Sequence, residues 1–527
     1  MSLNSLQSRR LVLAWFALIL YWAALYLPGL GIRELKGEEA RRALPAVEML
    51  RTGNWVVPHL HGTPYLRKPT LINWLIAASI KVTHSQSDWA VRLPSVLMML
   101  AMAAAIFATA RQWLPLSGAW MAAIISLSGV GLAEKGRLAE IEAVYVGLTG
   151  IAFAWGLAAW VNKRTGWRLW LVPAICLGLG LLTKGPAQWL FFYAVIVALL
   201  IAARETRQLL SLPHLGSIAL ALLLFSAWAI PYFEATAAEH AETVWVDQMQ
   251  QRIGGGSISQ IGANLLRAFA DGLPWILFAP LWWNSKVLAQ LDERRRTLVC
   301  AARWPLVVGF FGLMLVPGML PRYTLPLYPA AALLLALVLP SVSSGSQKIW
   351  RWINWGIFGL ALAAAALCPI LVRPFTPEWL SLLPVLLLLG FVALPAWRGF
   401  LREESVLRLV AGSALAVAAA LGIYASFLMP KIYAVMTVRM AGAQIDAAIP
   451  PTSRLHVVDP GYQPILFYVT RPCVFVPSAS KLPVETEYVL LSKKDWESAR
   501  KRLGGGRALA RFGPDGKKQI LLIQSPH

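Results

Sequence analysis

The stretch GEEARRALPAVEML, residues 37–50, places two carboxylates and two guanidinium groups just after the first apolar run of the chain. A carboxylate can remove a proton from an attacking hydroxyl group, and a nearby cation keeps it ionised. In a helix, Arg41 and Arg42 lie on the same face as Glu38, whereas Glu39 points about 100° away. The spacing therefore predicts one carboxylate that two guanidinium groups orient.

The same stretch has a second interpretation that involves no chemistry. Leu44, Val47 and Leu50 follow one face of the predicted helix, and the charged residues follow the other. This pattern is typical of an amphipathic helix that lies on a membrane surface. In that case the charges simply face water.

Other charged and phenolic side chains lie in the rest of the first loop and in later loops between apolar runs. They are Tyr65, Arg67, Lys68, Arg137, Glu140, Glu142, Lys184, Asp247, Arg252, Arg322 and Tyr323. Charged groups beside hydrocarbon are unfavourable and tend to mark function. Cations and a tyrosine hydroxyl can bind a phosphate while a carboxylate accepts a proton, so the set suits a lipid-linked phosphate substrate.

The HLH triplet, residues 59–61, offers two imidazole groups as metal ligands. A protein zinc site normally has three or four ligands, and one short histidine pair does not define a site. The sequence therefore leaves a divalent metal open and predicts no certain cofactor.

These residues must be positioned by a chain that is mostly apolar. Hydrophobic residues make up 57% of its 527 residues and charged residues 14%, with a mean hydropathy of +0.59, whereas soluble domains have roughly 25% charged residues. This composition predicts a polytopic membrane protein. The net charge of +22 fits basic loops that contact anionic lipid headgroups, and we expect no nucleic-acid partner. The four cysteines lack CxxC spacing and predict neither a disulfide framework nor a thiolate metal site.

About thirteen apolar runs are long enough, or nearly long enough, to cross a bilayer. They lie at 11–31, 93–111, 116–134, 143–161, 169–183, 187–203, 211–230, 269–288, 304–318, 324–341, 352–372, 379–397 and 407–429. Basic residues collect in alternate loops, beginning with Arg9 and Arg10. The positive-inside rule then places the N-terminus inside and the tail after residue 430 outside.

This topology predicts two domains. Residues 1–430 form a transmembrane domain with a long first periplasmic loop at 32–92, and residues 431–527 form a small soluble α/β domain. The tail contains the strand-like runs RLHVVD, CVFVP, EYVLLS and KQILLIQ, the helical runs YQPILFYV and KKDWESARKRL, and the turn GPDG. We expect this domain to cap the membrane part.

The charged loops resemble those of the GT-C polyprenyl-phosphate-sugar glycosyltransferases. Within that superfamily they are most similar to the branch of the lipid A aminoarabinose transferases and the bacterial protein-mannosyltransferase-like enzymes. The first-loop motifs are EEAR at 38–41, GNWVVP at 53–58 and YLRKP at 65–69. RLAEIE, LLTKGP and LPRYTLPLYP follow in the family's order, so the resemblance covers residues 1 to about 340.

The resemblance implies a GT-C fold, for which the apolar runs give about thirteen transmembrane helices, and a role for individual residues. Glu38 would be the general-base or substrate-orienting carboxylate and Glu142 a second acidic residue of the catalytic site, both where the family usually has Asp. Arg67 stands where an acidic residue is common. The lipid phosphate would be bound by Tyr65, Lys68, Arg252 and Tyr323, with support from Arg41, Arg42, Arg137, Lys184 and Arg322.

The resemblance further implies an enzyme of the bacterial inner membrane that moves a sugar from polyprenyl (undecaprenyl) phosphate to an acceptor on the periplasmic side, with inversion. The acceptor could be lipid A, another glycan or a protein. A transporter or flippase would bind the same lipid phosphate without chemistry, and a structural assembly subunit would leave the external charges unexplained. Glu38 discriminates between these hypotheses, because a phosphate binder has little use for a carboxylate aimed at the headgroup.

Overall fold

The structure, a computed structural model, describes residues 3–236, 246–247, 257–371, 405–424, 437–513 and 519–526. The chain divides into two compact units. Unit 1 contains Met1–Ile32, Arg67–Ile72 and Arg92–Lys431, and unit 2 contains Arg33–Leu66, Asn73–Val91 and Ile432–His527.

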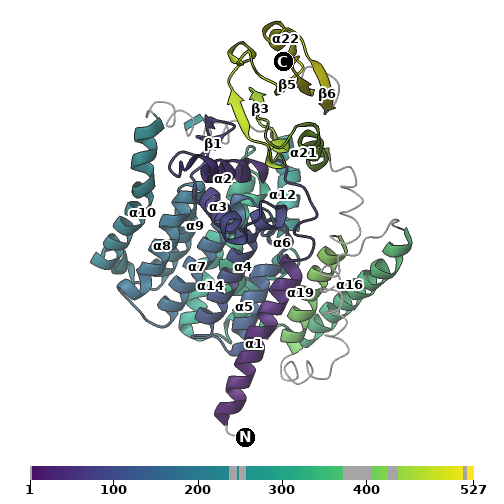
Figure 1. Ribbon diagram of the computed structural model, residues 1–527. Coiled ribbons are helices and arrows are strands. Elements are labelled where there is room, and N and C mark those ends of the chain that lie inside the picture. Colours follow the sequence, from purple (N-terminus) through teal and green to yellow (C-terminus); the bar gives the residue numbers. More distant parts are fainter. Residues whose placement is uncertain are drawn as a thin grey trace. The chain divides into compact units, whose positions relative to one another are not determined.

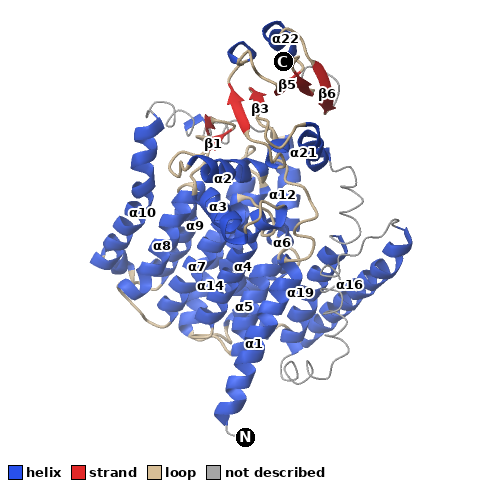
Figure 2. Ribbon diagram, in the orientation of Figure 1, coloured by secondary structure: helices blue, strands red, loops and turns tan. Residues whose placement is uncertain are grey.

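The regular secondary structure in the described residues of unit 1 is all helical (Figure 1 and Figure 2). Its long helices are α1 (Leu3–Tyr26), α4 (Asp88–Ala110, which begins in unit 2), α7 (Ile141–Val161), α8 (Trp167–Lys184), α10 (Leu212–Thr236), α14 (Glu293–Met314), α16 (Ser344–Leu371) and α19 (Ser405–Ile423). Shorter α-helices are α5 (Leu116–Ser128), α6 (Val130–Lys135), α9 (Ala187–Ala202), α12 (Ser259–Asp271), α13 (Ser285–Leu288) and α15 (Tyr328–Val338). The 3-10 helices are η1 (Thr206–Leu210), η2 (Trp275–Trp283), η3 (Pro321–Leu327) and η4 (Leu339–Ser341).

Eight helical segments in the described part of the chain are long and apolar enough to cross a membrane. Each overlaps a predicted run: Gln7–Tyr26, Asp88–Ala110, Ile141–Val161, Trp167–Lys184, Leu212–Thr236, Glu293–Met314, Pro321–Ser341 and Val406–Ile423. The protein is therefore a multi-pass membrane protein. The total of about thirteen spans stays a prediction, and the run at 379–397 lies outside the described residues.

Two predicted spans are broken in the structure. The run at 269–288 is divided among the end of α12, the 3-10 helix η2 and the short α13. Pro274 and Pro280 explain the break, because proline removes a backbone donor and its ring clashes with the preceding turn. The run at 116–134 is divided between α5 and α6, because Gly129 between them has an extended backbone.

Helix α7 is the most buried of the candidate spans in unit 1. It contacts α8, α9, α15 and η3. Gly147 and Gly150 leave room for Met98 and Met102 of α4 to pack against its backbone, a common use of small residues in membrane helices. This packing fixes the position of the α7 N-terminus, which carries acidic residues.

Unit 2 combines segments of the predicted first loop with the C-terminal residues. From the loop come α2 (Ala40–Thr52), the antiparallel hairpin of β1 (His59–Leu60) and β2 (Thr63–Pro64), and most of α3 (Leu71–Thr83). The C-terminal part supplies α21 (Thr437–Ala448), α22 (Trp496–Leu503), the 3-10 helices η6 (Pro464–Phe467) and η7 (Ala479–Lys481), and a sheet. Helix α2 and helix α21 each contact η6.

The sheet has five strands in the order β4-β3-β5-β7-β6. Strand β3 (Leu455–Val458) pairs in parallel with β4 (Cys473–Val476) and β5 (Tyr488–Ser492). Strand β7 (Ile520–Gln524) pairs antiparallel with β5 and with β6 (Arg507–Phe512). Apolar side chains of β3, β5 and β7 pack against α22 around Leu491, Leu503 and Ile523.

The four strand-like runs of the tail are strands, and KKDWESARKRL contains helix α22. YQPILFYV forms one short 3-10 helix, η6, and β6 was not predicted. Most of the GPDG turn lies outside the described residues. The domain boundary at residue 430 and the external location of the tail stay predictions.

Candidate active site

Glu38 lies in the turn that leads into α2, and two guanidinium groups hold its carboxylate. Arg41 Nη1 lies 2.9 Å from Glu38 Oε1, and Arg42 Nη2 lies 2.7 Å from Oε2. These charge-assisted hydrogen bonds fix both oxygens of the carboxylate. The side chain of Glu38 is still 31% exposed, so a substrate can reach it.

The local backbone explains this geometry. Gly37 has a φ of +55°, a conformation that glycine adopts without strain. Helix α2 starts at Ala40, two residues later than Glu38. Glu39 already has helical dihedral angles of −63° and −50°, so the predicted three- and four-residue spacing still brings both arginines to Glu38.

The interpretation of α2 as a surface helix with its charges in water is wrong. Ala40 and the residues from Arg42 to Met49 are buried. Arg42 is 3% exposed, and its Nη1 donates to the Tyr65 hydroxyl at 3.0 Å. Asn73 Nδ2 donates to the Arg42 carbonyl at 2.8 Å. A buried guanidinium group must be paired, and the first loop supplies the partners of Arg42.

Glu39 differs from its neighbour in access rather than in chemistry. It is 1% exposed, whereas about a third of the Glu38 side chain is open to solvent. Of the acidic pair, Glu38 is therefore the carboxylate that a substrate can contact.

A second charged cluster lies in unit 1, where Glu142 meets two cations. Lys184 Nζ lies 3.1 Å from Glu142 Oε1, and Arg322 Nε lies 3.2 Å from the same oxygen. Glu142 is in the first turn of α7, where the helix dipole favours a negative charge. Lys184 is the last residue of α8, before Gly185. This buried carboxylate holds two cations in place.

Glu140 extends this cluster. Arg322 Nη1 lies 3.7 Å from its carboxylate and Lys135 Nζ 3.1 Å from it. Burial raises the pKa of Glu140, and the neighbouring Glu142 carboxylate raises it further. Three cations thus share two carboxylates, and the cluster of Lys135, Glu140, Glu142, Lys184 and Arg322 carries one net positive charge when both carboxylates are ionised.

Tyr323 joins the same cluster through its ring. The Lys184 ammonium lies 4.4 Å from the centre of the Tyr323 ring, which is within the range of a cation–π interaction. Tyr323 is in η3, next to Arg322. The structure therefore groups Glu142, Lys184, Arg322 and Tyr323 in unit 1, and Glu38, Arg41, Arg42 and Tyr65 in unit 2.

The other predicted site residues are less well defined. Arg137 is buried in the turn between α6 and α7. Lys68 is half-buried and Arg67 is exposed, both in the short segment of unit 1 before α3. Arg252 lies outside the described residues.

The histidines of the HLH triplet have structural partners. His59 Nδ1 lies 2.8 Å from the Val57 carbonyl oxygen. His61 is 4% exposed, and its Nε2 accepts a hydrogen bond from the Gln463 N–H at 3.2 Å. Burial lowers the pKa of His61 to about 4. In the part of the chain that the structure describes, no three His, Cys, Asp or Glu side chains are grouped as metal ligands.

Sequence reasoning missed two contributors to the clusters. Lys135 precedes Glu140 by five residues in EKGRLAE. This closeness to a predicted site residue could have indicated that Lys135 pairs with it. Tyr462 contacts Arg41 and Gly37 in unit 2. Because it lies more than 400 residues away in sequence, no spacing rule links it to the first loop.

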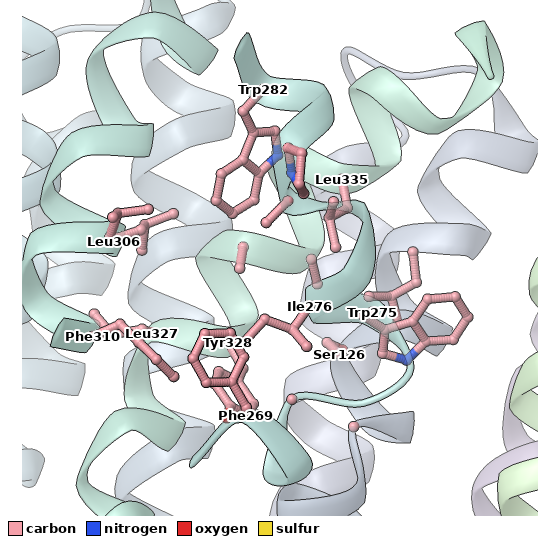
Figure 3. Close-up of a pocket in the computed structure, with 18 of the residues that line it drawn as sticks. Ser126, Phe269, Trp275, Ile276, Trp282, Leu306, Phe310, Leu327, Tyr328 and Leu335 are labelled. Carbon is pink, nitrogen blue, oxygen red and sulfur yellow. The ribbon is translucent and has the colours of Figure 1, made fainter. Parts of the chain in front are cut away.

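An apolar cavity of about 530 Å³ lies inside unit 1. Its walls come from α5, α12, η2, α14 and α15, and include Trp282, Phe310 and Tyr328 (Figure 3). Leu327, the last residue of η3, also lines the cavity. One short 3-10 helix therefore carries a wall residue of the cavity and two residues of the charged cluster, Arg322 and Tyr323.

Comparison with known proteins identifies relatives over most of the chain. Residues 67–230 match the family of dolichyl-phosphate-mannose-protein mannosyltransferases. The undecaprenyl phosphate-alpha-4-amino-4-deoxy-L-arabinose arabinosyl transferase of Pseudomonas aeruginosa is 28% identical over 74% of this chain and 72% of its own. The enzyme of that name from Pectobacterium atrosepticum is 26% identical over 77% of this chain and 74% of its own.

Solved structures share the fold of this chain. ArnT from Cupriavidus metallidurans bound to undecaprenyl phosphate superposes with a TM-score of 0.70 and 17% identity, covering 99% of this chain and 98% of that one. Its apo form gives a TM-score of 0.68. The predicted resemblance is confirmed, because the chain is similar in sequence to these transferases and has the fold of the ArnT structures.

Proposed function

We propose that this chain transfers a sugar from undecaprenyl phosphate to a hydroxyl group of an envelope acceptor. The observation that carries the proposal is the Glu38 carboxylate, which is 31% exposed and held by Arg41 and Arg42. The names of the curated relatives, which specify an undecaprenyl-phosphate-linked aminoarabinose, support the same class of donor.

In this reaction Glu38 accepts the proton of the acceptor hydroxyl group as the oxygen attacks. A bond forms between that oxygen and the anomeric carbon of the donor sugar. The bond from the anomeric carbon to the phosphate oxygen breaks, and its electron pair leaves with undecaprenyl phosphate. Attack from the face opposite the leaving group inverts the anomeric centre.

The leaving phosphate needs cations, because negative charge accumulates on it in the transition state. We assign this role to Lys184 and Arg322, with Tyr323 and Lys68 as further contacts. Glu142 is buried between Lys184 and Arg322 and serves to position them. The contacts of Tyr65 and Arg252 with the lipid phosphate stay predictions from the sequence.

The apolar cavity of unit 1 suits part of the prenyl chain. It has a volume of about 530 Å³, and the labelled side chains that line it are almost all apolar (Figure 3). Leu327 links it to the helix that bears Arg322 and Tyr323. A lipid-linked phosphate has this combination of an anionic head and a hydrocarbon tail.

The periplasmic side of the bacterial inner membrane is the proposed place of reaction, with lipid A, another glycan or a protein as acceptor. The predicted topology supports this orientation, since the basic loops collect on the opposite face. Mass spectrometry of envelope glycolipids and glycoproteins from cells with and without the gene would identify the acceptor.

The direct test uses the full-length protein in detergent, with undecaprenyl phosphate-α-4-amino-4-deoxy-L-arabinose and lipid A. We expect Glu38→Gln to lower kcat about a hundredfold to ten-thousandfold, with binding of undecaprenyl phosphate retained. Glu39→Gln is the matched control and should lose much less. Normal turnover by Glu38→Gln would contradict the catalytic assignment, and donor binding without transfer by the unmodified protein would favour a lipid-handling transporter.

A further inference from the structure

Residues just before Glu38 are bound by the C-terminal part of the chain, all within unit 2. Glu34 Oε2 accepts hydrogen bonds from the backbone N–H groups of Val438 at 3.0 Å and Arg439 at 2.9 Å. The Leu35 N–H donates to the Tyr468 hydroxyl at 2.6 Å. The backbone that leads to the proposed base is therefore held by residues about 400 positions later.

Tyr462 is the C-terminal residue that reaches the Glu38 turn itself. Its hydroxyl donates to the Gly37 carbonyl at 2.5 Å. The centre of its ring lies 4.7 Å from the Arg41 guanidinium carbon, and Arg41 donates to Glu38 Oε1. One side chain thus contacts the backbone before Glu38 and a cation that orients its carboxylate.

The two arginines that hold Glu38 differ in their own support. Arg42 is 3% exposed and is fixed by Tyr65. Arg41 is 35% exposed, and a partly exposed arginine has many rotamers to lose when it is ordered. An aromatic ring against the guanidinium group restricts those rotamers. The orientation of Arg41 therefore depends on Tyr462, whereas that of Arg42 depends on Tyr65.

We propose that Tyr462 is a positioning residue for the transfer reaction. It holds the Gly37 carbonyl and the Arg41 guanidinium group so that the Glu38 carboxylate keeps the orientation needed to accept a proton. This inference rests on the proposed role of Glu38 as the base. It makes the C-terminal domain part of the catalytic apparatus rather than a cover.

The neighbouring contact supports the same conclusion. The Gln463 N–H donates to His61 Nε2, so two consecutive C-terminal residues each bind the first loop. Burial also raises the pKa of Tyr462, which keeps its hydroxyl protonated and able to donate to Gly37 at neutral pH.

The test compares variants of the full-length protein with undecaprenyl phosphate-α-4-amino-4-deoxy-L-arabinose and lipid A. Tyr462→Leu removes the ring and the hydroxyl, and we expect kcat to fall about threefold to thirtyfold with an unchanged donor KM. Tyr462→Phe keeps the ring and should recover most of that loss. Tyr488→Phe, in strand β5 of the C-terminal sheet, is the matched control and should retain full activity.

A double-mutant cycle separates positioning from general stability. If Tyr462 acts through Arg41, then Arg41→Met combined with Tyr462→Leu should be no slower than the slower single variant. Multiplication of the two losses would overturn the inference. If Tyr462→Leu gives no monodisperse size-exclusion peak, Tyr462→Gln, which keeps a donor without the ring, takes its place in the cycle.

Glu38→Gln, measured in parallel, distinguishes failure of this inference from failure of the proposed function. An inactive Glu38→Gln variant together with unchanged kcat in Tyr462→Leu overturns the role of Tyr462 alone. A fully active Glu38→Gln variant removes the proposed base, and the inference with it.

Discussion

Lys184, the last residue of α8, pairs with Glu142, in the first turn of α7, at an N–O distance of 3.1 Å. The two residues are 42 positions apart in sequence. Their side chains are 13% and 7% exposed, and Arg322 also pairs with the Glu142 carboxylate, so ion-pair partners stabilise these buried charges more than water does.

Lys184→Met should therefore destabilise the protein, because it leaves a buried carboxylate with one cation fewer. Breaking a buried ion pair typically costs about 3 kcal/mol. Lys184→Met combined with Glu142→Gln should recover most of the stability, since both charges are then gone, but should not recover donor use. Thermal unfolding in detergent and donor KM measure the two effects, and equal stability of the single and double variants would contradict the pairing.

Tyr323→Phe and Lys68→Ala should weaken use of the donor. Loss of a hydrogen bond to a charged group typically costs about 1.5–3 kcal/mol, which corresponds to roughly tenfold to a hundredfold in kcat/KM. Steady-state kinetics with increasing donor concentration give this value, and Tyr488→Phe is again the control. Unchanged kinetics in both variants would remove Tyr323 and Lys68 from the phosphate site.

Ala332→Phe should obstruct the cavity of unit 1, because Ala332 is buried and lines it. Each buried CH₂ group contributes about 0.8 kcal/mol, so the displacement of one isoprene unit would raise the KM for an undecaprenyl donor by at least about tenfold. A donor with a short prenyl chain is the matched control and should be used equally well by both proteins. An equal loss for both donors would indicate general damage instead.

Stability should fall with pH between 6.5 and 4 through His61. Burial lowers the pKa of this imidazole to about 4, from about 6.5 in an unfolded chain. The unfolded state therefore binds the proton first, so stability is intact above pH 6.5 and declines by up to about 3 kcal/mol as pH falls to 4.

His61→Gln removes this titration while it keeps an acceptor for the Gln463 N–H. The difference in melting temperature between the original protein and this variant, measured in detergent from pH 7.5 to 4, isolates the contribution of His61. A difference that does not vary with pH would show that His61 is not the titrating group.

Local spacing made part of the site predictable. Glu38, Arg41 and Arg42 lie within five consecutive residues, so helical geometry alone indicates their contacts. The pairs of Lys184 with Glu142 and of Tyr462 with Gly37 depend on tertiary packing between distant segments, and no periodicity in the sequence encodes them.

The fold, too, could be predicted only in part from local sequence patterns. Long apolar runs such as 143–161 are recognisable because a helix that crosses the bilayer needs about twenty mostly apolar residues. The run at 269–288 is equally apolar, but two prolines divide it, and hydropathy does not register backbone breaks. Strand β6 was missed because RALARF carries two arginines, whereas its neighbour β7 is almost entirely apolar.

Strand β6 lies at one edge of the five-stranded sheet, and this position affects whether copies of the protein associate at high concentration. An edge strand exposes unpaired backbone groups that can join the sheet of another molecule. Strand β6 bears Arg507 and Arg511, and its pairing with β7 is irregular between Ala508 and Ala510. Like charges and a distorted ladder make association through β6 unfavourable, so this edge of the sheet is protected against aggregation during overexpression and crowding.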